Sequence, residues 1–274
     1  MLKRMLENVR SCTPLVHCIT NYVTVNDCAN ILLACGGSPI MADDSEEVEE
    51  ITSICDGLVI NIGTLNKNTI ESMILAGKKA NELGHPVILD PVGVGASTLR
   101  TQTAQRLLNE IHFTVIRGNI SEIKTLAKGS GITKGVDANL ADMVTEENLE
   151  ETIRFAQDFA KKTEAVIVIT GAMDLVVDTC HAYAVKNGHP MMAKVTGTGC
   201  MLTAIIGAYL AANKAQPLEA TVAAVCAMGL CGEIAYDKML KNEGGNGSYR
   251  NNLMDSIYNL QGDRLEGGAR YEVR

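Results

Sequence analysis

The sequence contains no tryptophan, and aromatic residues of all kinds make up only 4% of its 274 residues. Few flat side chains are therefore available to stack on bases, which is how many proteins bind single-stranded nucleic acids. The formal net charge of -8 also repels phosphate backbones. These features argue against a nucleic-acid partner, although a local positive pocket for a single nucleotide is compatible with them.

The nine cysteines include no C-x-x-C pair, and their number is odd. The spacing that a zinc ribbon or a thioredoxin-like redox motif requires is therefore missing. The first ten residues mix charges of both signs and lack the apolar core of a signal peptide. Free thiols without an export signal are typical of the reducing cytoplasm, so we expect a cytoplasmic protein.

Long hydrophobic runs are also missing. The longest, at 201–212 and 220–231, are shorter than the ~20 residues that a membrane-spanning helix needs. We expect both runs to form buried helices, and we expect no membrane partner. Hydrophobic residues nevertheless make up 46% of the chain, which is enough for a large core.

Short β-rich runs alternate with helix-like runs along most of the chain. The continuous apolar runs at 58–60 and 166–169 are typical of strands covered on both faces, as in a parallel sheet. Strands are predicted at 16–20, 57–62, 87–90, 113–117 and 165–170, with an edge hairpin formed by 176–178 and 182–185. Helices are predicted at 25–35, 46–54, 69–83, 99–111, 146–162, 199–212, 218–239 and 252–260.

No internal repeat, low-complexity segment or proline-rich linker divides the chain. We therefore predict one domain over residues 1–274, of the α/β class. Asp44 followed by Glu47 resembles a capping box and predicts the start of the helix at 46–54.

The strongest local signal for a site is the run T-G-T-G-C at 196–200, directly before an apolar helix. Glycines at such a place let the backbone approach an anion, which the free N–H groups and the helix dipole stabilise. Cys200 would lie beside that anion, and a helix N-terminus lowers the pKa of a thiol. An ordinary glycine-rich helix start with a buried cysteine fits this short pattern equally well.

Three further polar segments follow predicted strands. Asp90 begins D-P-V-G-V-G, Arg117 begins R-G-N-I-S-E, which ends at Glu122, and Thr170 precedes a glycine. Open α/β sheets bind their ligands at the carboxyl ends of the strands. Arg117 can pair with phosphate, and Glu122 can hold Mg²⁺ or its waters. Each residue alone is most simply a surface or turn residue, but their shared position favours one site.

Together these segments resemble the ribokinase-like superfamily, whose members combine an Asn-x-x-Glu segment with a glycine-rich anion hole near the end of the chain. Here these are 119–122 and 197–200. The runs H-C-I-T-N-Y-V at 17–23 and G-S-P-I-M-A at 37–42 are similar to hydroxyethylthiazole kinases. The resemblance spans almost the whole chain. It implies a ribokinase-like fold with a central, mostly parallel sheet, helices on both faces and no lid.

The resemblance further implies transfer of phosphate from ATP to the hydroxyl of 4-methyl-5-(2-hydroxyethyl)thiazole, in thiamin biosynthesis or salvage, with Mg²⁺ as cofactor. It implies a homotrimer with active sites between subunits. The implied residues are Met41, Gly197, Asn21 and Gly63 on the thiazole alcohol, Arg117, Thr170 and Gly199 on ATP, Asp90 and Glu122 near Mg²⁺, and Cys200 at the catalytic-base position. In the wider superfamily an Asp usually stands at the position of Cys200. At position 198 we expect a small residue such as Ala, where this sequence has Thr198.

Other functions of the same fold remain open. They are hydroxymethylpyrimidine kinase, an ADP- or ATP-dependent dehydratase of hydrated nicotinamide cofactors, and a non-catalytic protein that binds a thiazole or a nucleotide. The segments around Asn21 and Met41 argue against the dehydratase. The acids Asp90 and Glu122 argue against simple binding, which needs no groups to position Mg²⁺.

Overall fold

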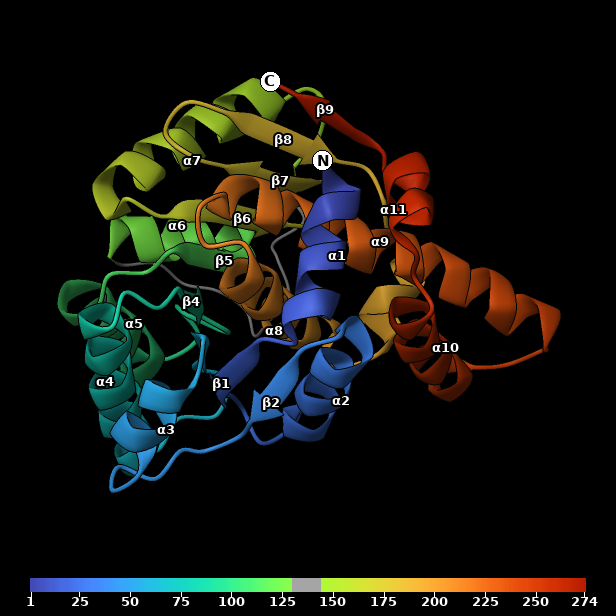
Figure 1. The fold of residues 1–274 in the computed structure, drawn as a ribbon. Coiled ribbons are helices and arrows are strands. Elements are labelled where there is room, and N and C mark those ends of the chain that lie inside the picture. The colour runs from blue at the N-terminus through green and yellow to red at the C-terminus, as the bar shows by residue number, and fades with distance from the viewer. Residues whose placement is uncertain (130–143) are drawn as a thin grey trace.

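A computed structural model describes residues 1–129 and 144–274. The described strands form one nine-stranded sheet in the order β2-β1-β3-β4-β5-β6-β7-β8-β9 (Figure 1). Neighbouring strands from β2 to β6 are parallel, and the pairs from β6 to β9 are antiparallel. The strands are β1 Leu15–Ile19, β2 Ser38–Ile40, β3 Gly57–Asn61, β4 Val87–Asp90, β5 Val115–Asn119, β6 Val166–Thr170, β7 Asp174–Val177, β8 Ala182–Val185 and β9 Tyr271–Val273. The predicted α/β class with a mostly parallel sheet is confirmed.

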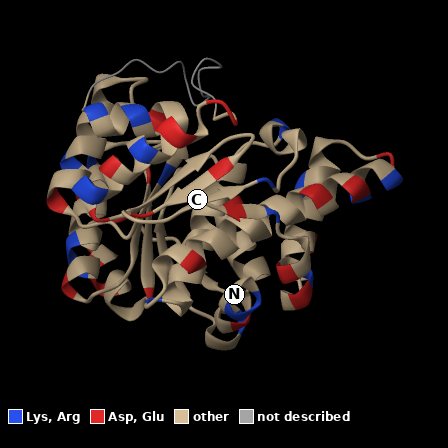
Figure 2. Ribbon diagram, turned by 90° about the horizontal axis from the view of Figure 1, so that it is seen from above, with Lys and Arg blue, Asp and Glu red and all other residues tan. Residues whose placement is uncertain are grey.

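Helices cover both faces of this sheet. The described α-helices are α1 Leu2–Cys12, α2 Val25–Cys35, α3 Val48–Ile54, α4 Lys67–Glu82, α5 Thr98–Glu110, α6 Ile120–Lys128, α7 Leu149–Thr163, α8 Thr198–Ala212, α9 Pro217–Lys241, α10 Asn246–Tyr258 and α11 Gly262–Gly268. Between β1 and β3 the chain forms only α2, β2 and α3, so no lid is inserted there. Figure 2 shows basic and acidic residues interspersed over these helical layers.

Alternating strand side chains supply two hydrophobic cores, one on each face of the sheet. In β3, Val59 joins the core that contains α1, α2, α8, α9, α10 and α11. Its neighbours Leu58 and Ile60 join the other core, with α3, α4, α5, α6 and α7. This alternation is the two-residue period of a strand, and burial on both faces explains why the sequence runs are continuously apolar.

The apolar helices α8 and α9 lie in the first of these cores, as predicted. Among the described residues, α9 alone is long and apolar enough to cross a membrane, but 83% of its most apolar window is buried inside the protein. Its hydrophobic surface is thus already covered by the fold.

Several predicted elements have different boundaries in the structure, and some were not predicted. The strand expected at 113–117 is β5, two residues later, and α10 begins before 252. The predicted capping box of α3 is wrong, because Asp44 Oδ1 accepts a hydrogen bond from the Glu46 amide in a turn, and Glu47 caps the helix without its side chain. Helices α1, α6 and α11 and the three-residue strands β2 and β9 were not predicted.

Candidate active site

The carboxyl ends of the parallel strands bring three of the predicted site residues to one edge of the sheet. Asp90 is the last residue of β4, Arg117 lies in β5, and Thr170 ends β6. The register pairs Asp90 with Asn61 of β3, so these two side chains start from adjacent positions. Helix α8, with Cys200 in its first turn, packs against β1, β3 and β4.

Asp90 is completely buried, and its two carboxylate oxygens have very different surroundings. Oδ2 accepts hydrogen bonds from Asn61 Nδ2 at 2.9 Å and Thr203 Oγ1 at 2.8 Å, and it lies 3.6 Å from Arg117 Nη1. Oδ1 is buried without a partner. Burial raises the pKa of Asp90, and the neighbouring Arg117 guanidinium opposes that shift. An unpaired buried carboxylate oxygen is costly, and such groups are often found where a ligand completes them.

Arg117 extends from β5 toward the first turn of α8. Its Nη2 donates to Thr170 Oγ1 at 2.7 Å, and its Nε is buried without a partner. A Cβ on Gly199 would lie 2.6 Å from Arg117 Nη1, so the glycine makes room for the guanidinium. The structure therefore brings together the three residues predicted to contact ATP.

Glu122 belongs to a capping box at the start of α6. Its Oε2 accepts from the Asn119 amide at 2.8 Å, while the Asn119 side chain accepts from the Glu122 amide at 2.9 Å. The other oxygen, Oε1, accepts from the Gly93 amide at 2.8 Å. Burial, followed by the charge of nearby Asp90, raises the pKa of Glu122 to about 7. The Asn-x-x-Glu segment thus builds a helix start as well as placing a carboxyl group near Asp90.

Cys200 is held by two side-chain amides. Its sulfur accepts from Asn21 Nδ2 at 3.2 Å and from Asn61 Nδ2 at 3.3 Å. Burial and the nearby Asp90 carboxylate raise the pKa of the Cys200 thiol. The expectation that the pKa would be lowered is wrong, because desolvation and the Asp90 charge outweigh the hydrogen bonds from Thr24 and Asn21 and the charge of Arg117. Cys200 is therefore a neutral thiol at neutral pH.

The N-terminal segment reaches this group through Asn21. Its Oδ1 accepts from the backbone and hydroxyl of Thr24, and its Nδ2 donates to Asn61 Oδ1 as well as to Cys200. Gly197 precedes α8 with a φ of +84°, where an added Cβ would lie 2.4 Å from Thr24 Cγ2. A glycine is required there both for its backbone angle and for this close approach.

Of two further residues predicted to contact the substrate, one belongs to this hydrogen-bonded network and the other does not. Gly63 belongs to it, since its amide donates to Asn61 Oδ1 at 2.9 Å. Met41 follows β2 and packs, half-buried, against the core on the α8 side of the sheet. In the described chain, the structure therefore does not join Met41 to the hydrogen-bonded group.

Asn61 and Thr203 are site residues that the sequence analysis missed. Both donate to Asp90 Oδ2 from buried positions. The available signals were the position of Asn61 at the end of a predicted strand and that of Thr203, one helical turn after Gly199. Neither residue type is uncommon enough in those places to have been selected.

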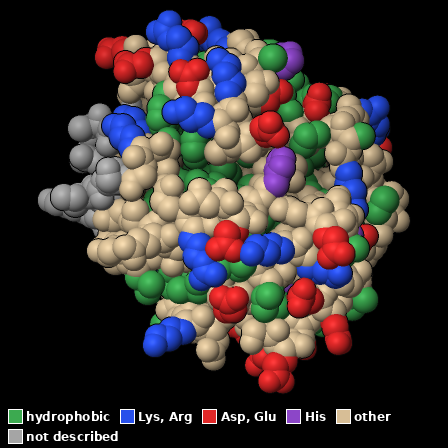
Figure 3. All heavy atoms as spheres, turned by 90° about the vertical axis from the view of Figure 1, so that its left-hand side faces the viewer, with side chains coloured by type: hydrophobic (Ala, Val, Ile, Leu, Met, Phe, Trp, Pro, Cys, Tyr) green, Lys and Arg blue, Asp and Glu red, His purple; other side chains and the backbone are tan. Residues whose placement is uncertain are grey.

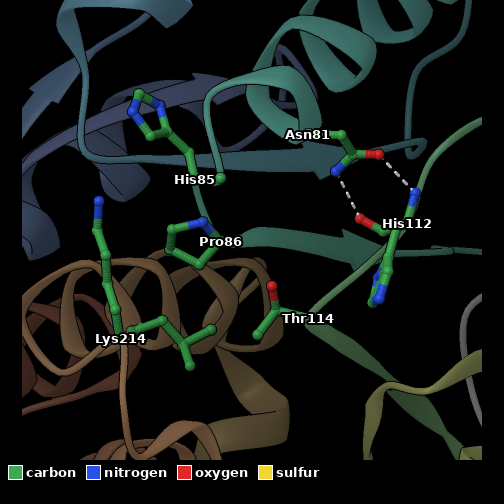
Figure 4. Close-up of a pocket in the computed structure, with 8 residues that line it drawn as sticks. Asn81, His85, Pro86, His112, Thr114 and Lys214 are labelled. Carbon is green, nitrogen blue, oxygen red and sulfur yellow. Dashed lines mark hydrogen bonds between the residues drawn. The ribbon is translucent and has the colours of Figure 1, made fainter.

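A cavity of about 260 Å³ lies elsewhere, at the amino ends of β4 and β5 (Figure 4). Its lining residues are Asn81, Gly84, His85, Pro86, His112, Thr114, Leu210 and Lys214. Asn81 and the backbone of His112 hydrogen-bond each other in both directions. Figure 3 shows one helical face of the molecule, where charged side chains of both signs surround smaller hydrophobic patches. None of the predicted site residues lines this cavity.

The mostly parallel sheet with helices on both faces is the fold of the ribokinase-like class of kinases. A pyridoxal kinase from Staphylococcus aureus, solved with AMP-PCP, shares this fold with a TM-score of 0.58 over 80% of this chain and 87% of that one, at 17% identity. The model of the hydroxyethylthiazole kinase family matches residues 6–263. This chain belongs to that family.

Individual relatives agree with this assignment over nearly their full lengths. A hydroxyethylthiazole kinase from Clostridium acetobutylicum is 66% identical over 272 residues, which cover 99% of each chain. One from Desulfovibrio desulfuricans is 50% identical, with 98% of this chain and 96% of that one covered. The solved hydroxyethylthiazole kinase of Pyrococcus horikoshii is similar with a TM-score of 0.88 and 37% identity, covering 100% of this chain and 98% of that one.

Proposed function

We propose that this protein transfers the γ-phosphoryl group of ATP to the primary hydroxyl of 4-methyl-5-(2-hydroxyethyl)thiazole, in thiamin biosynthesis or salvage. The observation that carries the proposal is the buried, unpaired Oδ1 of Asp90 beside Arg117, at the N-terminus of α8. Free helix N–H groups and a guanidinium stabilise the charge on a phosphoryl group in transfer. A protein that only bound a thiazole would have no use for a buried acid at that place.

The residues present fit a Mg²⁺ ion that arrives with the nucleotide. Among the described residues, no group of three or more His, Cys, Asp or Glu side chains could hold a metal ion alone. Mg²⁺ in kinases is commonly held by one or two carboxylates together with substrate phosphates and water. Asp90 has a free oxygen for this role, and Glu122 lies close enough to raise the local negative charge. The ion would neutralise charge on the transferring phosphate.

We assign Cys200 to the acceptor hydroxyl, as a group that orients it. The sulfur lies in the first turn of α8, directly after Gly199, and Gly197 is the N-cap of this helix. We assign Gly197 to the thiazole alcohol and Gly199 to the phosphates. A neutral thiol is a weak base, but phosphoryl transfer through a loose transition state depends mainly on positioning and charge stabilisation. Asn21 and Gly63 would line the same subsite, with Met41 beyond them, while Arg117 and Thr170 contact ATP.

We further propose a homotrimer of single-domain subunits, with each active site completed by a neighbouring subunit. Two large apolar side chains directly follow Asn21 and are exposed, namely Tyr22 at 77% and Val23 at 58%, and Leu33 of α2 is 56% exposed. Exposed apolar groups beside a site are typical of a protein–protein interface. A subunit placed there would cover the thiazole subsite, exclude water and bring a second Met41 toward it.

The nine free cysteines fit a cytoplasmic location.

The activity is tested by a coupled assay with ATP and, in parallel, the thiazole alcohol or hydroxymethylpyrimidine. We expect ADP release with the thiazole alcohol and not with the pyrimidine, and preferred turnover of the pyrimidine would reject the proposed substrate.

The shared site is tested by mixing the inactive variants Met41→Arg and Glu122→Gln under conditions where subunits exchange. Partial recovery of activity is expected, whereas no recovery despite proven exchange would exclude sites shared between subunits.

A further inference from the structure

We propose that Asn61 is a positioning residue for the phosphoryl transfer: its side-chain amide fixes the Cys200 sulfur and the Asp90 carboxylate relative to each other. This inference rests on the proposed function. Asn61 ends β3, is 1% exposed and pairs with Asp90 of β4, and helix α8 packs against β3.

All four hydrogen-bonding positions of the Asn61 side chain are used. Its Nδ2 donates to Asp90 Oδ2 at 2.9 Å and to Cys200 Sγ at 3.3 Å. Its Oδ1 accepts from Asn21 Nδ2 at 3.1 Å and from the Gly63 amide at 2.9 Å. An amide offers two donors and two acceptor lone pairs, so no further bond is available to it.

These partners also fix which way the amide faces. With its oxygen and nitrogen exchanged, Asn61 would place oxygen against the Asp90 carboxylate and N–H₂ against the Gly63 N–H. Both contacts would be repulsive, so the surrounding groups determine a single orientation. A fully satisfied buried network is rigid, and rigidity is what a positioning residue must supply.

The network connects the acceptor side of the proposed site to its phosphate side. Cys200 and Asn21 belong to the thiazole subsite, while Asp90 lies beside the group proposed to hold Mg²⁺ and phosphate. Asn61 is the described side chain that hydrogen-bonds both Cys200 and Asp90. Because in-line transfer needs the hydroxyl and the phosphoryl group in register, loss of this connection should slow the chemical step more than it weakens binding.

Asn61→Ala is expected to lower kcat about 10- to 100-fold, the cost of a misplacement near 1 Å, with KM for both substrates within about threefold of wild type. Asn66→Ala is the matched control. Asn66 lies on the β3–α4 connection that follows Asn61, but its side chain accepts from the Asn68 and Thr69 amides and caps α4. It should lower stability while leaving kcat unchanged.

A double-mutant cycle with Cys200→Ala tests whether Asn61 acts through the sulfur. If it does, Asn61→Ala costs at least fivefold less in the Cys200→Ala background than in wild type, since coupled residues are not additive. An equal cost in both backgrounds would mean that Asn61 does not act through Cys200.

The alkylation rate of Cys200 gives a second readout that needs no turnover. In a Cys12→Ser, Cys180→Ser background the two exposed thiols are absent, Cys200 is half-buried and the remaining cysteines are buried. Reaction with iodoacetamide, followed by mass spectrometry of the peptide that contains Cys200, should change severalfold in Asn61→Ala and not in Asn66→Ala. If Asn61→Ala does not fold, Asn61→Ser replaces it in the test, since the serine hydroxyl can accept the hydrogen bond of the Gly63 amide without reaching the sulfur.

An unchanged alkylation rate together with additive kinetics would overturn the proposal. The proposed function fails separately, if wild-type protein does not phosphorylate the thiazole alcohol. In that case a changed alkylation rate in Asn61→Ala would still show that the amide positions the sulfur.

Discussion

Polar side chains lie at both ends of the sheet, but they are buried at the carboxyl end and more exposed at the amino end. At the carboxyl end, Asp90 and Glu122 are buried beside Arg117, and Asp90 Oδ1 has no partner. At the amino end, a cavity of about 260 Å³ is lined by His85 and Lys214 among others, and Lys214 is exposed to solvent. The amino end of the sheet thus has a cavity lined in part by exposed groups, whereas the carboxyl end has buried charged side chains.

The cost of burying charge explains why the second feature is the better guide to function. Taking a carboxylate out of water is unfavourable unless hydrogen bonds or opposite charges compensate it. Burial raises the pKa values of Asp90 and Glu122, so the neighbouring donors and Arg117 compensate their negative charge only in part. Exposed groups such as Lys214 carry no comparable cost, so their convergence on a cavity says little about what binds there.

The strongest test of this contrast compares one cation from each end. Arg117→Ala removes the charge beside Gly199 and Thr170, and an arginine that stabilises phosphoryl transfer contributes on the order of 10³-fold or more to kcat. Lys214→Ala should leave kcat within about twofold of wild type. Steady-state kinetics of both variants measure this, and equal losses would remove the distinction between the two ends.

Glu122→Gln should have the next largest effect, about 10²-fold on kcat, because it removes the carboxylate that we propose helps Asp90 to hold the Mg²⁺ ion against the phosphates. An interaction made only in the transition state lowers kcat and kcat/KM equally. The capping hydrogen bond from the Asn119 amide to the retained carbonyl oxygen can persist in the variant. A rise of KM for the thiazole with unchanged kcat would instead make Glu122 a binding residue.

Cys200→Ala should be impaired but not inactive, by about 10²-fold, the lower end of what assistance to a hydroxyl contributes. A neutral thiol that orients the hydroxyl does less than an ionised base. Cys200→Asp should therefore remain active, since a carboxylate can accept the same amide hydrogen bonds. An alanine variant as fast as wild type would remove Cys200 from the mechanism.

The parts of the fold predicted from sequence are those with a strong local pattern. β3 and β6 were recognised because burial on both faces makes their runs continuously apolar. In contrast, β2 and β9 have three residues each and form through pairing with β1 and β8, which no local pattern reveals. Helix α1 has a readable pattern, with Leu2, Met5, Leu6 and Val9 buried at helical spacing, so its sequence does indicate a helix, although none is predicted there.

The site was predictable where a motif placed a residue at a strand end or a helix start. The convergence of Asp90, Arg117 and Thr170 followed from the parallel topology alone. The direction in which the pKa of Cys200 shifts could not be predicted in this way, because it depends on how completely neighbouring elements exclude water. For the same reason the sequence could not show that Asn61 links the sulfur to the Asp90 carboxylate.

The smallest expected effect concerns stability rather than catalysis, and it follows from the carboxyl end alone. The pKa of Glu122 is raised from 4.5 to about 7 in the folded protein. Between these values the folded state binds more protons than the unfolded state, so the free energy of unfolding falls as pH rises. The slope reaches at most about 1.4 kcal/mol per pH unit for one group. Denaturant titrations of wild type and Glu122→Gln from pH 5 to 8, without metal or nucleotide, measure it as a difference. The variant should lack the decline below pH 7 that Glu122 causes, and identical pH profiles would show that Glu122 ionises normally in the fold.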